Sequence, residues 1–297
     1  TVEWGISMKN KRKVNSTGVG LGLHARRILA YVVLIIVSFF CLFWFYVLFV
    51  NATRSNSNLQ SGFSVLPSSN LLSNWKHLLD KSGLPVIQGM LNSLIISTCS
   101  AVVCVYFSTM TAYAIHVYDF KLKKFIYPFI LAVMMIPTQV TALGFVNLVS
   151  DMNLEDSFIP LIIPQIAVPI TFFYMKQYME SSLPLSLVEA ARIDGSGEFR
   201  TFNHIVLPLM KPAIAVQAIF TFVSSWNNYF IPALILHDDS KKTLPILIAQ
   251  LRAADWLKFD MGQVYIMIAF SIFPVIVVYL ILSKHIVQGV ALGSVKG

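Results

Sequence analysis

Long apolar segments alternate with short polar ones along this chain. Six apolar segments have no charged residue in their interior and are long enough to cross about 30 Å of hydrocarbon. Backbone polar groups cannot be hydrated at that depth, so each segment is expected to satisfy its own hydrogen bonds as a helix. The pattern predicts an all-α polytopic membrane protein with six transmembrane helices, at Ile28–Val50, Gly89–Ile115, Phe125–Asn147, Phe158–Met175, Pro212–Leu236 and Gln263–Ser283.

The polar segments between the spans give the remaining organisation. The loop after the first span is rich in Ser and Asn, and a short amphipathic helix is expected in it at residues 74–79. Prolines within or beside the spans predict helix bends at Pro137, Pro164, Pro169 and Pro274. The predicted units are a basic flexible tail at 1–27, the first span at 28–50, an external loop at 51–88, a membrane core at 89–283 with a long polar loop at 177–211, and a second tail at 284–297.

Charge adds the orientation of the chain in the membrane. Charged residues are only 12% of the 297 residues, against about a quarter in soluble domains. The net charge of +8 would suit a nucleic-acid partner, but with the N-terminus inside, 15 of the 22 Lys and Arg residues fall on the cytoplasmic side. Such a bias is typical of membrane proteins. We therefore expect both termini in the cytoplasm and no nucleic-acid partner.

Several kinds of chemistry have no support in the sequence. Ion-coupled transporters usually carry charged groups at membrane depth, where each costs about 2.5–3.5 kcal/mol to insert, and the spans have none in their interiors. Cys41, Cys99 and Cys104 lie in spans, and neither a metal-ligand spacing nor the P-loop G-x-x-x-x-G-K-[ST] occurs. If the chain is a transporter, its energy must then come from another protein, or its transport is passive.

The polar loop at 177–211 has the pattern of two short helices separated by a glycine. Pro184 suits a first turn, and Ser186 with Glu189 fits a capping box. Gly195 suits the left-handed position that follows a helix, and Ser196 is then expected to cap the next one. The second helix is predicted to end near Pro208 and has an apolar stripe formed by Phe199, Phe202, Ile205 and Val206.

The first of these helices has the features of a docking surface. Ala190 and Ala191 are small, so the backbone of a partner could approach closely, and the carboxylate of Glu189 could pair with an arginine of that partner. The alternative is that Glu189 only caps the helix and that the two alanines are only good helix formers.

Taken together, the residues of the polar loop form a recognisable motif. Glu189-Ala190-Ala191, Gly195 and Ile205-x-Leu207-Pro208 match, at every spacing, the cytoplasmic signature of ABC-importer permeases, which the chain resembles. Asn228 departs from the pattern, because many relatives have an acidic residue there, and this puts a charge-dependent role at that position in doubt. Further stretches over residues 88–297 are similar to the six-helix permease of maltose-type carbohydrate importers: Ile193-Asp194-Gly195, Leu207-Pro208-Leu209 with Pro212, Trp226 to Pro232, Thr243-Leu244-Pro245, and Gly289 to Gly297.

The resemblance implies a type I ABC-importer permease fold in a multi-pass protein of the bacterial plasma (inner) membrane. The helix at 187–194 would be a coupling helix that lies in a cleft of an ATPase subunit, and residues 289–297 would reach toward the ATPase dimer unless they are a helical end without a partner. ATP and Mg²⁺ would bind to the two ATPase subunits, so this chain would hold no cofactor and would not be an enzyme. Further implied partners are a second homologous permease, an external solute-binding protein, membrane lipid and a carbohydrate. The implied coupling residues are Glu189, Ala190, Ala191, Asp194, Gly195, Ile205, Leu207 and Pro208.

Uncharged polar residues inside the spans are the expected lining of a transport path. Sugars form hydrogen bonds in many directions and stack their apolar faces on aromatic rings, so amide and aromatic side chains suit them. The alternative for each such residue is that it joins two helices within the membrane. The predicted path residues are Asn92, Gln139, Ser225, Trp226, Asn227, Asn228 and Tyr229, and the wider polar set includes Ser93, Gln165, Gln217 and Ser224.

Two other functions fit the same sequence. One is a facilitator or channel that needs no ATPase. The other is an importer for a different solute, such as an amino acid or a phosphate derivative. A charged solute would usually need a fixed opposite charge along its path, and the spans show none.

Overall fold

Every regular element is a helix in the computed structural model, which describes residues 16–80, 82–253 and 260–293. Four helical segments are long and apolar enough to cross a membrane, and a fifth is counted when Glu198–Leu209 and Lys211–Trp226, which meet at 81°, are taken as one bent span. The four are His24–Ala52 of α1 (Ser16–Ala52), α4 (Val86–Val117), Ile159–Ser182, and Met261–Lys284 of α15 (Met261–Gly293).

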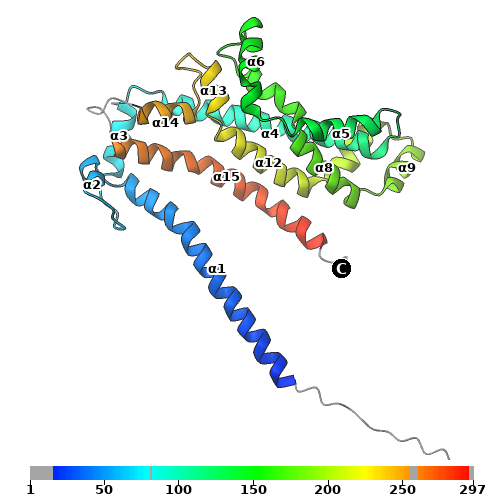
Figure 1. The fold of residues 1–297 in the computed structure, drawn as a ribbon, viewed down its shortest axis with the longest axis horizontal. Helices are drawn as coiled ribbons and strands as arrows, with labels where there is room; N and C mark the ends of the chain where they lie inside the picture. Colours follow the sequence, from blue (N-terminus) through cyan, green and yellow to red (C-terminus); the bar gives the residue numbers. More distant parts are fainter. Residues whose placement is uncertain (1–15, 81, 254–259, 294–297) are drawn as a thin grey trace, which may run out of the picture.

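The third predicted span, Phe125–Asn147, is divided into two short helices, which corrects the prediction. They are α5 (Lys123–Val133) and α6 (Thr138–Asp151), and Figure 1 shows α6 standing away from the rest of the body. The division falls just before Pro137, as the proline predicted, because the residue that precedes a proline is disfavoured in the α conformation.

The fourth and fifth predicted spans are also segmented. In the fourth, α7 (Ile159–Ile162) leads into the 3-10 helix η1 (Ile163–Ala167) and then α8 (Pro169–Ser182), so the helix type changes beside Pro164 and Pro169, while Ile159–Ser182 still counts as one candidate span. The fifth predicted span, Pro212–Leu236, is not a single helix. In its place α12 (Lys211–Trp226) ends at Trp226 and the short α13 (Phe230–Ile235) follows.

Helix α4 lies at the centre of the body, where it packs against α8 and α12, and α12 packs in turn against α15 (Figure 1). Small side chains allow this close packing without a large hydrophobic driving force within a membrane. The small polar residues that α4 buries are Ser93, Ser97, Ser100, Ser108 and Thr109.

The connections gather at opposite ends of the body (Figure 1). One end has α2 (Asn56–Gln60), α3 (Leu71–Asp80), and α14 (Leu244–Arg252), which packs between α4 and α15. The short helix predicted at 74–79 is confirmed as α3, and its Trp75 ring lies 4.8 Å from that of Phe270 on α15. The other end has α9 (Leu185–Ile193), α10 (Glu198–Thr201), the π turn η2 (Phe202–Val206) and α11 (Leu207–Leu209).

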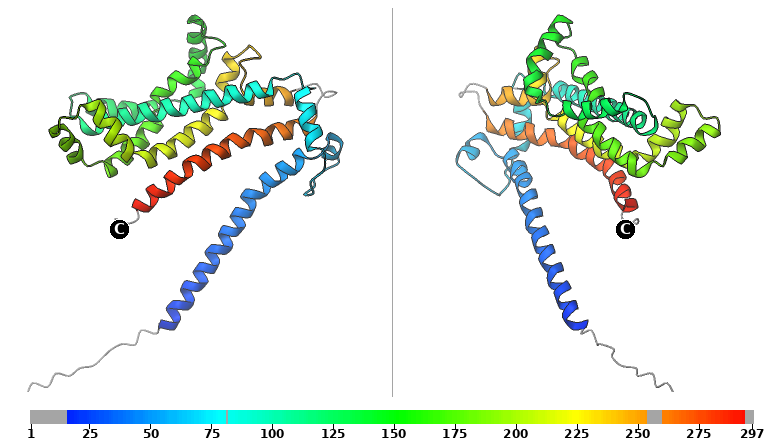
Figure 2. Two further views of the ribbon diagram at one scale, coloured as in Figure 1. Left: turned by 180° about the vertical axis from the view of Figure 1, so that it is seen from behind. Right: turned by 45° about the vertical axis from the view of Figure 1, so that its right-hand side comes forward.

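Helix α1 extends away from the body and approaches α15 only near its own C-terminal end (Figures 1 and 2). Most of its apolar side chains are exposed. Because α1 begins at Ser16, residues 16–27 are helical and the prediction of a flexible tail is wrong there. Helix α15 continues to Gly293, beyond the predicted boundary at Ser283. The rest of the two predicted tails, residues 1–15 and 294–297, lies outside the described residues.

Candidate functional site

The chain between α8 and α12 folds into a helical protrusion at one end of the body (Figure 1). The prediction of two short helices separated by a glycine is confirmed, because α9 and α10 flank Gly195. The expected coupling residues are all in this segment: Glu189, Ala190 and Ala191 on α9, Asp194 and Gly195 directly after it, Ile205 in η2, and Leu207 and Pro208 in α11.

The predicted caps at the starts of the two helices are not present. Helix α9 begins one residue after Pro184, which occupies the cap position and offers no side-chain acceptor, so the capping box of Ser186 and Glu189 is wrong. The cap residue of α10 is Gly197, not Ser196. The hydroxyl of Ser196 instead accepts a hydrogen bond from that of Thr201 at 3.0 Å.

The predicted glycine stop is confirmed in detail. Gly195 has φ +76°, in the left-handed region. Its N–H donates to the carbonyl of Arg192 at 3.0 Å, and the N–H of Ser196 donates to the carbonyl of Ala191 at 2.9 Å. These two bonds form the Schellman arrangement, which satisfies carbonyls at the end of a helix and needs a residue that tolerates positive φ.

Helix α9 has one buried and one exposed face. Val188 is 1% exposed and belongs to an apolar cluster with residues of α4 and α8, and Ala191 is also buried. Glu189 and Ala190 face outward, and Ile193 is 87% exposed. The outward face therefore combines apolar side chains with the polar ones of Ser186, Glu189 and Arg192, on a helix whose other face is anchored in the core. Other large apolar side chains exposed around it are Leu185, Leu187 and Phe199.

Glu198, which the sequence did not indicate as a functional residue, connects the protrusion to α4. Its Oε1 accepts a hydrogen bond from Nε of Arg192 at 2.7 Å. Its Oε2 accepts hydrogen bonds from the hydroxyls of Tyr113 at 3.0 Å and of Tyr118 at 2.5 Å. Tyr113 is on α4 and Tyr118 directly follows it, so one carboxylate joins the end of α9, the start of α10 and the end of α4.

These contacts determine the charge state of the cluster. The hydrogen bonds from Arg192 and then Tyr118 lower the pKa of Glu198 from its usual 4.5 to about 2. Burial and the hydrogen bond to the carboxylate raise the pKa of Tyr118 above its ordinary value. At neutral pH the carboxylate is therefore ionised and accepts, while the phenol is protonated and donates.

Pro208 accounts for the bend between the protrusion and α12. A proline has no N–H to donate to the carbonyl four residues earlier, that of His204, and its ring crowds that carbonyl in a regular α-helix. The chain widens just before Pro208 into a π turn, in which the N–H of Leu207 donates to the carbonyl of Phe202. The axis then turns by 81° at Met210, the residue before α12.

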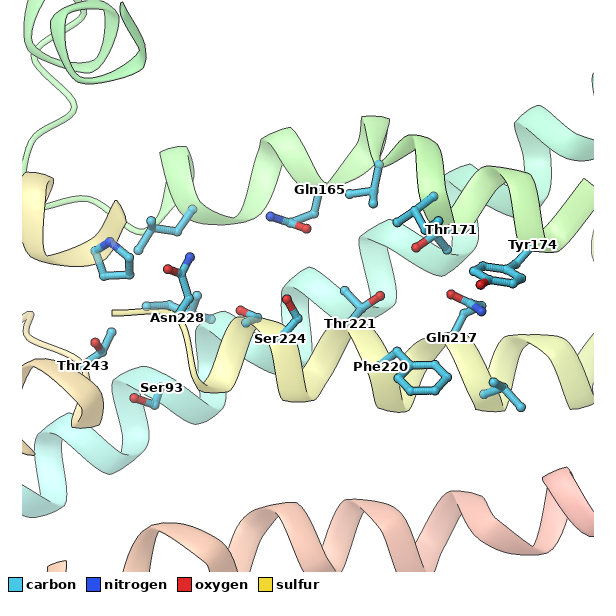
Figure 3. Close-up of a pocket in the computed structure, with 17 residues that line it drawn as sticks. Ser93, Gln165, Thr171, Tyr174, Gln217, Phe220, Thr221, Ser224, Asn228 and Thr243 are labelled. Carbon is cyan, nitrogen blue, oxygen red and sulfur yellow. The ribbon is translucent and has the colours of Figure 1, made fainter. Parts of the chain in front are cut away.

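A cavity of about 460 Å³ lies between α4, η1, α8 and α12 (Figure 3). Figure 3 shows Tyr174 on α8 facing Gln217 on α12, with Gln165 and Asn228 farther along the same space. No charged side chain lines it among the described residues. Thr243 also lines the cavity, and its buried hydroxyl has no hydrogen-bond partner among the residues that the structure describes. The cavity therefore offers amides, hydroxyls and aromatic rings to an uncharged polar molecule.

The structure brings only two of the seven predicted path residues to this cavity, Ser225 and Asn228. Asn92 is buried elsewhere, and its Nδ2 donates to the carbonyls of Ser240 and Lys242, both at 2.9 Å, so it fastens the chain before α14 to α4. Trp226 is in the core, with its ring stacked on that of Phe222 at 5.7 Å. The other three are exposed and outside the cavity: Gln139, Asn227 and Tyr229.

Sequence reasoning missed part of the lining, although helix periodicity contains a signal for it. Gln217, Thr221, Ser224 and Asn228 recur at intervals of three or four residues, so they share one face of α12 and its extension. A search for polar residues with this spacing would have added Thr221 to Gln217, Ser224 and Asn228. The lining residues that were not predicted include Thr171, Tyr174, Phe220, Thr221 and Thr243.

No group of three or more His, Cys, Asp or Glu side chains with the geometry of a metal site occurs within the described ranges.

Comparison with known proteins identifies the family. The family described as binding-protein-dependent transport system inner membrane component matches residues 105–292, more than half of the chain. The arabinooligosaccharides transport system permease protein AraQ of Bacillus subtilis is 36% identical over 209 residues, which cover 69% of this chain and 72% of that protein. The sn-glycerol-3-phosphate transport system permease protein UgpE of Yersinia pestis is 31% identical over 267 residues, which cover 88% of this chain and 95% of that protein.

A solved structure agrees with the fold. A chain in the crystal structure of a bacterial ABC transporter involved in the import of the acidic polysaccharide alginate matches with a TM-score of 0.74 and 22% identity, over 88% of this chain and 96% of that one. The predicted ABC-importer permease fold is thereby confirmed. This chain belongs to the family of binding-protein-dependent transport system inner membrane components, which are membrane transport subunits and not enzymes.

Proposed function

We propose that this chain is one of two homologous permease subunits of an ATP-driven carbohydrate importer, and that α9 is its coupling helix. The observation that carries the proposal is that α9 has one face exposed and the opposite face anchored in the core. Its outward face has Glu189, Ala190 and the exposed side chain of Ile193, while its inward face is anchored through Val188. Such a helix can seat in a cleft of an ATPase subunit without losing its own contacts to the permease.

Two connections from α9 lead to the helices that line the cavity. The carboxylate of Glu198 links the end of α9 to Tyr113 on α4. The bend at Met210 links the same protrusion to α12. A displacement of α9 by a closing ATPase dimer would therefore move α4 and α12, which form two walls of the cavity. In this mechanism ATP and Mg²⁺ bind to the ATPase subunits, and this chain contributes the lever and the path.

The distribution of charge supports a cytoplasmic location for α9. Basic residues on short loops favour the cytoplasmic side, and among the described residues the α9 end of the body carries more of them than the α14 end, which has Arg54, Lys76, Lys241, Lys242 and Arg252. With this orientation α1 begins and α15 ends in the cytoplasm, and the α14 end faces an external solute-binding protein. The basic residues of the α9 end include Lys121, Lys123, Lys124, Lys176, Arg192, Arg200 and Lys211.

The lining of the cavity supports a neutral carbohydrate as the substrate. Amides such as Gln165 and Gln217 can exchange hydrogen bonds with sugar hydroxyls, and the rings of Tyr174 and Phe220 can stack on apolar sugar faces. The names of the relatives include anionic substrates, a glycerol phosphate and an acidic polysaccharide, as well as arabinooligosaccharides. An uncharged lining favours the neutral class. An importer for another neutral solute is the second candidate, on the same observation.

Reconstitution tests the proposal. The chain would be purified from membranes with the subunits that accompany it and placed in liposomes with a panel of labelled oligosaccharides. Uptake is expected to require ATP and the ATPase subunits, and Gly195→Pro is expected to abolish it while the complex still assembles. Uptake by the chain alone, without ATP, would show a facilitator and reject the proposal. Wild-type uptake by Gly195→Pro would reject the role of α9.

A further inference from the structure

Besides the cavity between α4, η1, α8 and α12, two more cavities lie along a crevice between α4, α5 and α8. One, of about 810 Å³, has residues of all three helices and of the loop between α4 and α5 in its lining. The other, of about 320 Å³, is lined by residues of α4, α5, η1 and α8. We call them the basic cavity and the apolar cavity.

Helix periodicity places the two cavities one after the other along the same faces of α4 and α8. On α4, the basic cavity has Ile115 and the apolar cavity has Thr111 and Ser108, at intervals of four and three residues. On α8, Lys176 of the basic cavity is followed by Phe172 and Pro169 of the apolar one at the same intervals. Residues at such intervals share a helix face. On α5, the corresponding series is Tyr127, Ile130 and Val133.

The basic cavity has an excess of positive charge. Four lysines line it, Lys121, Lys123, Lys124 and Lys176, with Asp119 as the only carboxylate of the lining within the described chain. Nζ of Lys176 pairs with Glu180 at 2.6 Å and also lies 4.4 Å from the centre of the Tyr127 ring. Neither Lys121 nor Lys124 forms an ion pair with any residue that the structure describes. The cavity therefore attracts an anion and has two lysines free to bind it.

The apolar cavity begins where the basic one ends. The ring of Tyr127 lies between them, because it has Lys176 on one side and contacts the ring of Phe172, of the apolar lining, at 6.2 Å. No charged side chain lines the apolar cavity within the described residues. Phe129 on α5 is 56% exposed at its edge, so the crevice is open to the surrounding medium, and α4 and the segment Ile159–Ser182 beside it are candidate membrane spans.

We propose that this crevice binds one anionic phospholipid, with its phosphate among Lys121, Lys124 and Lys176 and an acyl chain along α5 past Tyr127. A basic pocket between transmembrane helices suits an anionic lipid headgroup. A free phosphate compound would use only the basic cavity, and the apolar cavity next to it would then have no occupant. Two apolar side chains next to the lysines, Leu122 and Phe125, are exposed, and acyl chains would cover them better than water does.

Native mass spectrometry of the purified protein, with the subunits that accompany it, tests the proposal. The endogenous lipid is first removed. Vesicles of anionic phosphatidylglycerol or of zwitterionic phosphatidylcholine are then added as probes. The wild type is expected to retain one phosphatidylglycerol in preference to phosphatidylcholine. Lys121→Gln with Lys124→Gln is expected to weaken this binding by about thirty-fold, because each lysine at an anionic headgroup contributes roughly a factor of five. The matched control is Lys284→Gln, an exposed lysine on α15 outside the crevice.

Three further arms separate the possible outcomes. Lys121→Arg with Lys124→Arg is expected to bind as the wild type, which shows that the charge and not a folding defect controls retention. Val133→Trp should fill the apolar cavity and release the lipid, whereas Val140→Trp on the exposed face of α6 should not. Millimolar inorganic phosphate should not displace the lipid. Equal retention of the two lipids, or phosphate binding that Val133→Trp leaves unchanged, would overturn the proposal.

Discussion

Nε of Arg192 lies 2.7 Å from Oε1 of Glu198, and this ion pair joins the last turn of α9 to the first turn of α10. The same carboxylate accepts hydrogen bonds from Tyr113 and Tyr118 at the end of α4. Exposed ion pairs contribute little to stability on their own. The importance of this one lies in the three segments that it holds together, since a force applied to α9 reaches α4 through it.

Replacing Glu198 with Gln should therefore reduce transport more than assembly. The neutral amide cannot form the ion pair with Arg192, so α9 can move without α4. Uptake per complex is expected to fall by roughly five-fold or more, the lower range of a typical coupling between sites, while the amount of ATPase that copurifies stays unchanged. The matched control is Glu180→Gln, which removes an ion pair confined to α8. Equal uptake by the two variants would contradict the role given to Glu198.

The same carboxylate predicts a pH dependence of stability. The pKa of Glu198 is lower in the folded protein, about 2, than its usual 4.5. Its contribution is therefore fully present above about pH 4.5 and is lost as the pH falls from there toward 2. Thermal unfolding of the wild type and Glu198→Gln should differ at pH 6 and converge at acid pH. A difference that persists unchanged at pH 3 would show that another group is responsible.

Gly195 and Gly197 form a matched pair for testing the end of α9. Neither has an atom within 4 Å of the position of an added Cβ, but Gly195 has φ +76° and Gly197 has φ −69°. Gly195→Ala should cost about 1–2 kcal/mol, because an L residue is disfavoured in the left-handed region, and should lower uptake. Gly197→Ala should be tolerated. Comparable losses in both variants, measured by thermal unfolding and uptake, would argue against the Schellman stop as the reason for this glycine.

The cavity residues should affect the handling of substrate and not assembly. Gln217→Ala and Gln165→Ala each remove an amide from the lining, so the substrate concentration for half-maximal uptake is expected to rise by about ten-fold, as for the loss of one or two hydrogen bonds. Gln139→Ala, on the exposed part of α6, is the control. The measurement is the concentration dependence of uptake in proteoliposomes. If Gln139→Ala alone changed the substrate concentration for half-maximal uptake, the substrate path would not lie in this cavity.

Much of the fold could be predicted because apolar length is a strong local signal. The spans that became α1, α4 and α15 are long and their interiors contain few breaks. The segment Phe125–Asn147 has the same composition, yet it divides before Pro137, and hydropathy alone does not distinguish a broken span from a continuous one. The capping box failed for a related reason, since α9 starts two residues earlier than the pattern of Ser186 and Glu189 requires.

The site was predictable only where its residues are close in sequence. The stop at Gly195 uses its own bond to the carbonyl three residues earlier and the bond of Ser196 to the carbonyl five residues before that serine, so a local pattern contains its role. Glu198 depends on Tyr113 and Tyr118, which are 85 and 80 residues away, and no spacing rule connects them. Asn92 was predicted as a path residue because it is polar and within a span. Its partners, the carbonyls of Ser240 and Lys242, are about 150 residues away, and only the structure shows that they satisfy it.

The central claim, that α9 contacts an ATPase subunit, is tested most directly by cross-linking in membranes. Single cysteines would replace Ala190 and Ile193 on the outward face of α9, and Gln139 on α6 as a control, in a background without Cys41, Cys99 and Cys104. A short thiol cross-linker should join the α9 cysteines, and not the control, to the ATPase subunit, with a yield that changes when ATP is added. Reaction of the α9 cysteines with an impermeant external maleimide, and no cross-link to an ATPase, would contradict the claim.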